Sequence, residues 1–288
     1  MNETTPKKSG FAVLIGRSNV GKSTLLNSLV GSKIAITSPK PQTTRLPIHG
    51  IITRENTQIV FVDTPGIIKK AKDTLTKKMH QAVEDSLQEV DVILYVVDPT
   101  RAIGEEERAT LRLIEKIDKP KILVINKIDE PRLPFIDFYR DLAPQFTDTI
   151  EVSALEETHL KNLVTLIEKH LPEQNFFYPD FQLTNLPNEI WLAELIREKL
   201  FLRLRQEVPY TTHVEVEEIT TRENGLVYVQ AVIYTTEERY QRMIIGSGGR
   251  GIREIGQAAR HELERVSGHK YYLDLEVKVD PHWTERVV

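Results

Sequence analysis

"GRSNVGKST", residues 16–24, follows the apolar run FAVLI at 11–15 and opens the amphipathic stretch KSTLLNSLV at 22–30. The spacing Gly16-x-x-x-x-Gly21-Lys22-Ser23, between a predicted strand and a predicted helix, fills every position of a phosphate-binding loop. In such a loop the backbone N–H groups and the helix N-terminus surround a polyphosphate. The residues expected to contact phosphate are Gly16, Asn19, Val20, Gly21, Lys22, Ser23 and Thr24.

The rest of the first 172 residues alternates short apolar runs with longer amphipathic ones. Strands are expected at 11–15, 48–53, 58–63, 91–98, 121–126 and 149–153. Helices are expected near 22–30, 73–89, 104–117, 134–143 and 159–171. This alternation predicts an α/β P-loop domain, with a mostly parallel sheet and helices on both faces. Ligands of such sheets bind at the carboxyl ends of the strands.

The strand at 58–63 ends in Asp63-Thr64-Pro65-Gly66. A carboxylate at that position can hold Mg²⁺ through a water, and the Gly66 N–H can approach a γ-phosphate. The loop SPKPQTTRLP at 38–47 offers a threonine hydroxyl as a further ligand, with Thr44 as the choice and Thr43 in reserve. The predicted metal ligands are Ser23, Thr44 and Asp63, and the predicted nucleotide contacts here are Asp63, Thr64, Pro65 and Gly66.

The next two strands end in motifs that indicate guanine. Asn126-Lys127-Ile128-Asp129 places a carboxylate that can accept from both N1–H and the 2-amino group, which adenine lacks. Asn126 is expected to tie this loop to the phosphate loop, and the Lys127 stem to cover the base. The segment Ser153-Ala154-Leu155 follows, and the Ala154 N–H is expected to meet guanine O6. The predicted cofactors are therefore GTP or GDP with Mg²⁺.

The catalytic residues predicted for GTP hydrolysis are Lys22, Thr44, Gly66 and Asn19. Many GTPases place a water-orienting glutamine after D-x-x-G, but this chain has Ile67, whose side chain cannot hydrogen-bond water. Slow intrinsic hydrolysis that needs outside help is therefore expected. Asn19 has two open interpretations: its carbonyl ligates K⁺ beside the phosphates, or it stabilises the loop turn.

A second domain is expected after a proline-bearing linker. The predicted ranges are 8–173 for the GTPase domain, 174–187 for the linker and 188–284 for a KH domain of order α-β-β-α-α-β. Residues 239–270 carry seven basic against three acidic side chains, around a G-x-x-G loop that lets a nucleic-acid backbone approach. Single-stranded RNA is the expected ligand, at Ile245, Gly246, Ser247, Gly248, Gly249, Arg250, Ile252 and Arg253.

Composition sets the remaining bounds. The 288 residues include no Cys, which excludes disulfides and thiolate chemistry, and the formal charge is −4. The first ten residues are polar, with no apolar signal core, and the longest apolar run is only VILYVV at 92–97. These features predict a cytoplasmic protein, and a monomer is expected.

The chain resembles the bacterial Era family, in which a GTPase domain precedes a KH domain. The motifs that carry the resemblance are GRSNVGKSTLLN, PQTTR, DTPG, NKID, SA, HLPE, REKL and IIGSGGRGIREIG. The resemblance implies binding to the 3′ end of 16S rRNA, a role in 30S subunit assembly, and peripheral association with the inner membrane. Ser18 stands where the family usually has proline.

Two other functions are compatible with the same residues. The first is a constitutive RNA-binding protein that keeps nucleotide as a structural ligand, for which Ile67 gives support. The second is a membrane-surface GTPase in cell-cycle control, although no amphipathic anchor is evident. GTP turnover with and without RNA separates the leading interpretation from the first alternative.

Overall fold

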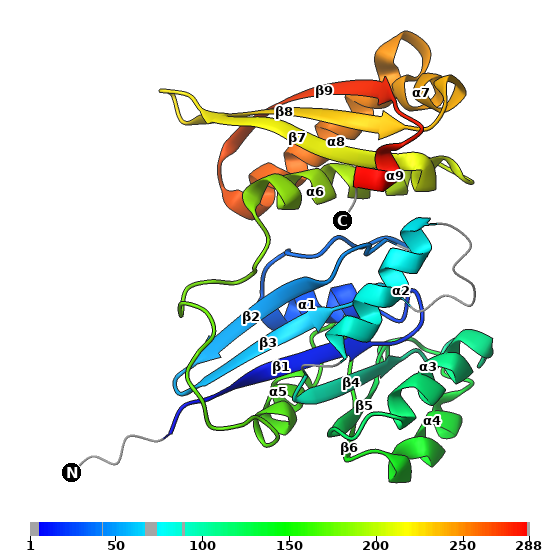
Figure 1. Cartoon of the computed structure of the whole chain (residues 1–288), viewed down its shortest axis with the longest axis vertical. Helices are drawn as coiled ribbons and strands as arrows, with labels where there is room; N and C mark the ends of the chain where they lie inside the picture. The colour runs from blue at the N-terminus through cyan, green and yellow to red at the C-terminus, as the bar shows by residue number, and fades with distance from the viewer. Residues whose placement is uncertain (1–5, 42, 67–73, 88–89, 287–288) are drawn as a thin grey trace. The chain divides into compact units, whose positions relative to one another are not determined.

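The computed structural model describes residues 6–41, 43–66, 74–87 and 90–286. Its contacts form two compact units (Figure 1). The first contains Met1–Ala35 and Thr44–Asn185, and the second contains Ile36–Thr43 and Leu186–Val288. These bounds differ from the sequence-based domain ranges 8–173, 174–187 and 188–284, which we keep as a proposal.

The first unit is a six-stranded sheet with the order β2-β3-β1-β4-β5-β6. All neighbouring strands are parallel except β2 and β3, which run antiparallel. The strands are β1 Lys8–Ile15, β2 Ile48–Arg54, β3 Thr57–Asp63, β4 Val92–Val97, β5 Lys121–Ile125 and β6 Asp148–Glu151. The order reverses beside β1, which pairs with β3 on one edge and with β4 on the other, so a crevice is expected at its carboxyl end.

Helices cover both faces of this sheet (Figure 1). Their bounds are α1 Lys22–Val30, α2 Thr74–Ser86, α3 Glu105–Glu115, α4 Ile136–Leu142 and α5 Leu160–Glu168. Val83 of α2, Ile114 of α3 and Tyr139 of α4 join one buried cluster with the strand residues that point to their face. The continuous Val/Ile/Leu strands are buried because both of their faces are covered, and β4 is buried along its whole length.

The second unit is a three-stranded sheet with helices packed against it. Its elements are α6 Asn188–Arg203, β7 Thr212–Thr221, β8 Leu226–Thr235, α7 Glu238–Ile245, α8 Arg250–Ser267, β9 Lys270–Val279 and α9 Trp283–Arg286. β7 and β8 are antiparallel, whereas β8 and β9 are parallel. Ile196 of α6, Ile244 of α7 and Ile255 of α8 share a buried core with the sheet. Except for α9, this is the predicted α-β-β-α-α-β order.

The fold class predicted from sequence is confirmed, and α1 has the predicted bounds. α9 was not expected, because its signal is a single aromatic residue and not a periodic pattern. Trp283 is buried, stacks on His213 with ring centroids 5.4 Å apart, and donates from Nε1 to Thr211 O at 3.0 Å. Within the described ranges, every helix is too short or too polar to cross a bilayer.

The segment Ile36–Thr43 lies in the second unit, although the sequence analysis places it in the first domain. Ile36 joins an apolar cluster with Leu192 and Leu195 of α6. The Thr37 N–H donates to the buried Glu198 carboxylate at 2.8 Å. Ile36 and Thr37 are therefore held by tertiary contacts that proline content and local charge do not reveal.

Candidate nucleotide site and nucleic-acid interface

The phosphate-binding loop joins β1 to α1 at the carboxyl end of the sheet. Lys22 begins α1, is buried, and donates from Nζ to Gly16 O at 2.9 Å and to Arg17 O at 3.1 Å. Burial lowers the pKa of Lys22, against the attraction of Asp63 and nearby glutamates. The ammonium group is thus held inside the loop, where a polyphosphate would supply stronger acceptors than two neutral carbonyls.

The three predicted metal ligands meet at the end of β3. Ser23 Oγ donates to Asp63 Oδ2 at 2.6 Å, and Thr44 Oγ1 lies 3.0 Å from Ser23 Oγ and 3.4 Å from Asp63 Oδ2. Thr43, the reserve choice, instead bonds Ser38 Oγ and Lys40 O. The sequence alone could not separate these two threonines, because they are neighbours with the same hydroxyl.

Asp63 is fully buried, and burial raises its pKa although Lys22 and the two hydroxyls favour the carboxylate. Its Oδ1 accepts no hydrogen bond from any described residue. A buried orphan carboxylate oxygen beside two hydroxyls is a set of hard oxygen donors of the kind that Mg²⁺ prefers. The residues present therefore fit a magnesium ion.

The rest of the D-x-x-G motif packs against the phosphate loop. Thr64 Oγ1 donates to Leu14 O at 2.8 Å, which fixes the start of the motif to β1. A Cβ added to Gly66 would lie 2.6 Å from Ser18 Oγ and 2.9 Å from the Ser18 backbone nitrogen, so only glycine allows this approach. Pro65, in the same motif, is buried. The predicted role of Ile67 lies outside the described residues.

The guanine-recognition motifs are linked to one another and to the phosphate loop. Asn126 donates from Nδ2 to Val20 O at 2.9 Å and accepts from the Ala154 N–H at 2.9 Å. Ser153 Oγ donates to Asp129 Oδ1 at 2.5 Å, which orients an otherwise exposed carboxylate. Because the Ala154 N–H already has an acceptor, the expected contact with guanine O6 requires that bond to be shared or exchanged.

Lys127 reaches back from this motif to the phosphate loop. Its Nζ donates to Asn19 O at 3.0 Å and pairs with Asp98 Oδ2 at 2.7 Å. Burial of Asp98 opposes its ionisation, but hydrogen bonds from Lys127 and Thr100 outweigh burial and lower the pKa of Asp98. Leu155, a predicted nucleotide contact, is 71% exposed, so its side chain adds little to the described part of the nucleotide site.

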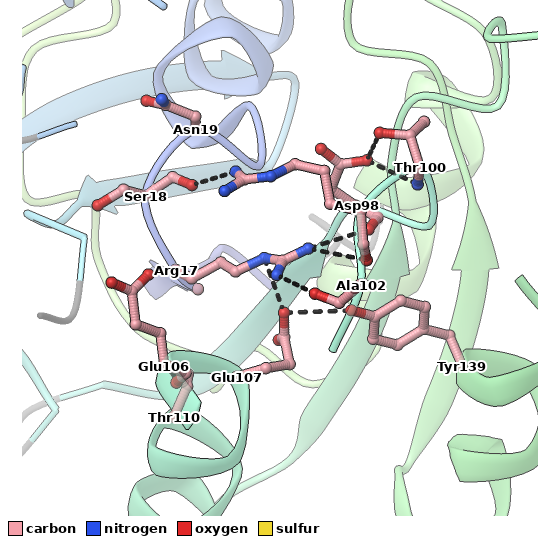
Figure 2. A network of polar contacts seen from close by, with 12 residues as sticks. Arg17, Ser18, Asn19, Asp98, Thr100, Ala102, Glu106, Glu107, Thr110 and Tyr139 are labelled. Atoms are coloured by element: carbon pink, nitrogen blue, oxygen red, sulfur yellow. Dashed lines mark hydrogen bonds and ion pairs between the residues drawn. The ribbon is translucent and has the colours of Figure 1, made fainter. Parts of the chain in front are cut away.

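A buried polar network beside the loop was missed by the sequence analysis (Figure 2). Arg17, 4% exposed, lies with Nε 3.0 Å from Glu107 Oε2, and Glu107 also accepts from the Tyr95 and Tyr139 hydroxyls. This burial and the carboxylate raise the pKa of both tyrosines. One feature of the sequence could have indicated a polar site here. Asp98 directly follows β4, much as Asp63 ends β3.

The G-x-x-G loop of the second unit joins α7 to α8. Gly246, Gly248 and Gly249 have φ values of 71°, 59° and 74°, in the left-handed range that glycine adopts without strain. Ser247 and Gly248 are exposed, and a Cβ on Gly248 would meet open space among the described residues. The loop therefore offers backbone without obstruction at the N-terminus of α8.

A groove of about 420 Å³ runs from this loop along α8 and β9. Of the residues predicted to bind RNA, Gly249, Ile252 and Arg253 line it, whereas Arg250 pairs with Glu254 at 3.4 Å. Ile245 packs against the core, and Gly246, Ser247 and Gly248 form the loop at its end. Sequence reasoning missed the remaining lining residues, which are Gly256, Gln257, Arg260, Tyr272, Leu273, Asp274 and Leu275. The spacing of residues 249, 253, 256 and 260 places them on one face of a helix, and this could have indicated the groove.

Comparison with known proteins gives two family matches. Residues 11–127 match the family described as 50S ribosome-binding GTPase, and residues 207–284 match the KH domain family. GTPase Era of Halothermothrix orenii is 42% identical over 281 residues, covering 97% of this chain and 95% of the relative. GTPase Era of Carboxydothermus hydrogenoformans is 45% identical over 293 residues, with 98% and 95% covered.

Two solved structures match along nearly the whole chain. One is an Aquifex aeolicus Era point variant bound to GDP and AlF₄⁻, with a TM-score of 0.90, 39% identity, and coverage of 97% of this chain and 96% of the other. The other is Era in complex with MgGDPNP and nucleotides 1506–1542 of 16S ribosomal RNA, with a TM-score of 0.90, 39% identity, and coverage of 98% and 96%.

Proposed function

This chain belongs to the Era family of GTPases, and from that membership we propose that it is an RNA-responsive GTPase switch in assembly of the 30S ribosomal subunit. In this proposal it binds GTP or GDP with Mg²⁺, and its KH domain binds the single-stranded 3′ end of 16S rRNA. The observation that carries the proposal is the relative solved with both MgGDPNP and a 16S rRNA segment, 39% identical over 98% of this chain.

The site geometry supports a role for each nucleotide motif. Lys22 would leave its two carbonyl acceptors for the β- and γ-phosphates, while the Ser23 and Thr44 hydroxyls and Asp63 would hold the magnesium ion. When bound there, the ion would supply positive charge against the charge that develops on the phosphoryl group. Gly66, against Ser18, would present its N–H to the γ-phosphate. Asp129, oriented by Ser153, would accept from guanine.

The KH groove has the features expected for single-stranded RNA. Exposed Arg253 and Arg260 supply positive charge, while Ile252, Tyr272 and Leu273 supply apolar and aromatic surface for unstacked bases. The exposed Ser247-Gly248 turn at its end allows close approach of a phosphate backbone. The groove therefore supports the expected class of ligand.

The test of this function is GTP hydrolysis with and without RNA. Single-turnover hydrolysis is measured across a titration of a single-stranded oligonucleotide with the 16S rRNA 3′-end sequence, and the complementary oligonucleotide is the control. We expect at least about tenfold stimulation, since an external partner often supplies far more in GTPases. RNA binding without stimulation would contradict the switch and leave a constitutive RNA-binding protein with a structural nucleotide.

A monovalent cation beside the phosphates gives a separate prediction. Asn19 has φ 65° and its backbone carbonyl is held by Lys127, while its carboxamide points away from the Arg17 network (Figure 2). If that carboxamide ligates K⁺, hydrolysis should be about tenfold faster in potassium than in sodium, because the ion adds positive charge in the transition state. Asn19→Ala should abolish the difference. Equal rates for wild type in both salts would assign Asn19 to the loop turn alone.

Location and assembly follow from family membership as proposals. A cytoplasmic monomer that meets the 30S subunit is the working assignment. Peripheral association with the inner membrane is a further proposal, which comes from the family resemblance. Co-sedimentation with anionic lipid vesicles would test it directly.

A further inference from the structure

Successive backbone carbonyl groups of the phosphate loop, from Gly16 to Val20, each accept a hydrogen bond from a side chain. Lys22 Nζ bonds Gly16 O and Arg17 O, Asn126 Nδ2 bonds Val20 O at 2.9 Å, and Lys127 Nζ bonds Asn19 O at 3.0 Å. Between them, Ser18 O accepts from Arg101 Nη1 at 3.0 Å. In a trans peptide the N–H points opposite to the C=O. Fixing the Ser18 carbonyl therefore fixes the direction of the Asn19 N–H, which belongs to the same peptide.

Arg101 differs from the other donors because it belongs to none of the nucleotide motifs. It lies in the loop between β4 and α3, which begins at Asp98, and its side chain is exposed. Lys22, Asn126 and Lys127 were assigned from their motifs. No sequence pattern assigns a task to Arg101.

The loop that carries Arg101 is itself fastened by the phosphate loop. Arg17 donates from its guanidinium to Asp98 O at 3.4 Å, Arg101 O at 3.2 Å and Ala102 O at 2.8 Å (Figure 2). The buried Glu107 of α3 pairs with Arg17 and prevents the guanidinium from turning away. Each loop therefore holds the backbone of the other through an arginine side chain. Arg17 binds carbonyls of residues 98–102, and Arg101 binds the Ser18 carbonyl.

The Ser18 residue that Arg101 holds lies beside Gly66 of the D-x-x-G motif. Gly66, whose N–H is expected to meet the γ-phosphate, approaches Ser18 so closely that a Cβ would overlap it. GDP has no group at this position. A hydrogen bond to Ser18 O should therefore matter for the hydrolytic step more than for binding of GDP.

We propose that Arg101 is a positioning residue for GTP hydrolysis, acting through the Ser18 carbonyl, and that the Arg17–Glu107 ion pair sets the loop from which it acts. The proposal rests on GTP hydrolysis at this phosphate loop. It assigns Arg101 no contact with the nucleotide, so its effect should follow the geometry of the Ser18 peptide and not the overall charge.

The direct test uses Arg101→Ala with Arg101→Lys and Arg108→Ala as companions. Arg108 is an exposed arginine on α3, so its replacement removes the same charge nearby. Dissociation constants for a fluorescent GDP analogue and single-turnover rates at saturating GTP are measured without RNA. We expect Arg101→Ala to hydrolyse GTP about tenfold more slowly, with a change in GDP affinity below about twofold. Arg101→Lys should recover part of the rate, and Arg108→Ala should match wild type.

Glu107→Gln provides a second, independent arm. Because it acts on the same loop, its effect on hydrolysis and that of Arg101→Ala should not add in the double variant. Thermal unfolding of each variant shows whether the buried substitution lowers stability, while the hydrolysis rate of the folded fraction tests coupling. Full additivity would contradict the proposed route from Glu107 to Ser18.

Three results would overturn the proposal. A wild-type rate of GTP hydrolysis by the Arg101→Ala protein would exclude the positioning role of Arg101. A proportional loss of GDP affinity and turnover would show a general loosening of the loop, and an equal effect of Arg108→Ala would show a long-range charge effect. If wild type itself failed to hydrolyse GTP, the proposed function would fail first, which is distinguishable because no variant is needed to see it.

Discussion

Replacement of Asp129 by asparagine is expected to lower the affinity for GTP by about 10³–10⁴-fold and to create affinity for xanthosine triphosphate. The carboxylate accepts from two donors on guanine, N1–H and the 2-amino group. A carboxamide can accept only at its oxygen, and its N–H₂ group would face the amino group. Xanthine has a carbonyl oxygen at that position, which the carboxamide can donate to.

The structure makes this prediction specific to the side-chain chemistry. Asp129 is exposed, and the rest of its motif is held by other contacts. Asn126 bonds the Val20 carbonyl, and Lys127 pairs with Asp98. The substitution therefore should not disturb the phosphate loop. Ser153, which donates to Asp129 Oδ1, can equally donate to a carboxamide oxygen.

The measurement is competition of GTP, GDP and xanthosine triphosphate for the nucleotide site, by equilibrium titration. Asp141→Asn makes the same chemical change at an exposed position of α4 and should leave the preference for guanine intact. Recovered binding of xanthosine triphosphate would show that the Asp129→Asn protein is folded. Unchanged affinity for GTP would contradict the assignment of Asp129 to guanine.

Motifs made of residues that are close in sequence could be located from the sequence, because local patterns encode them. The phosphate loop, the D-x-x-G turn and the N-K-x-D turn each follow a strand, and parallel strands bring their carboxyl ends to one edge of the sheet. Asp63 and Ser23, 40 positions apart, could therefore be placed together from motif order alone.

Contacts that depend on side-chain packing were not predictable in the same way. Glu107 and Arg17 are separated by 90 positions, and nothing in the α3 sequence distinguishes Glu107 from the neighbouring exposed or half-buried glutamates. Only the tertiary structure shows that Glu107 faces the buried side. The choice between Thr43 and Thr44 likewise depends on the direction of two adjacent side chains.

Replacement of both Ser247 and Gly248 by aspartate is expected to weaken RNA binding by about a hundredfold, roughly 2.8 kcal/mol. The two residues are exposed at the end of the α8 groove, where backbone without side chains lets a phosphate approach. Two carboxylates there would repel the phosphates and occupy their space. Gly248 has φ 59°, a conformation that aspartate tolerates better than most residues, so the fold should survive.

The matched control is Ser247→Asn with Gly248→Asn, which adds the same bulk without charge. Each protein is titrated with the 16S 3′-end oligonucleotide at several salt concentrations. Loss of phosphate contacts should flatten the dependence of log affinity on log salt in the aspartate variant. The asparagine variant should keep more of both the affinity and the salt slope. RNA affinity equal to wild type in the aspartate variant would contradict the KH groove as the RNA site.

The same variant also decides whether RNA acts on the nucleotide site. GTP binding should be unchanged, because the substituted loop and the phosphate loop belong to different compact units. Basal turnover should stay slow, since Ile67 cannot orient water in either protein. Only stimulation by RNA should disappear, at RNA concentrations that saturate wild type. If the variant lost RNA binding but kept the stimulated rate, the RNA effect would come from another surface, and the KH domain would be a tether without a part in the switch.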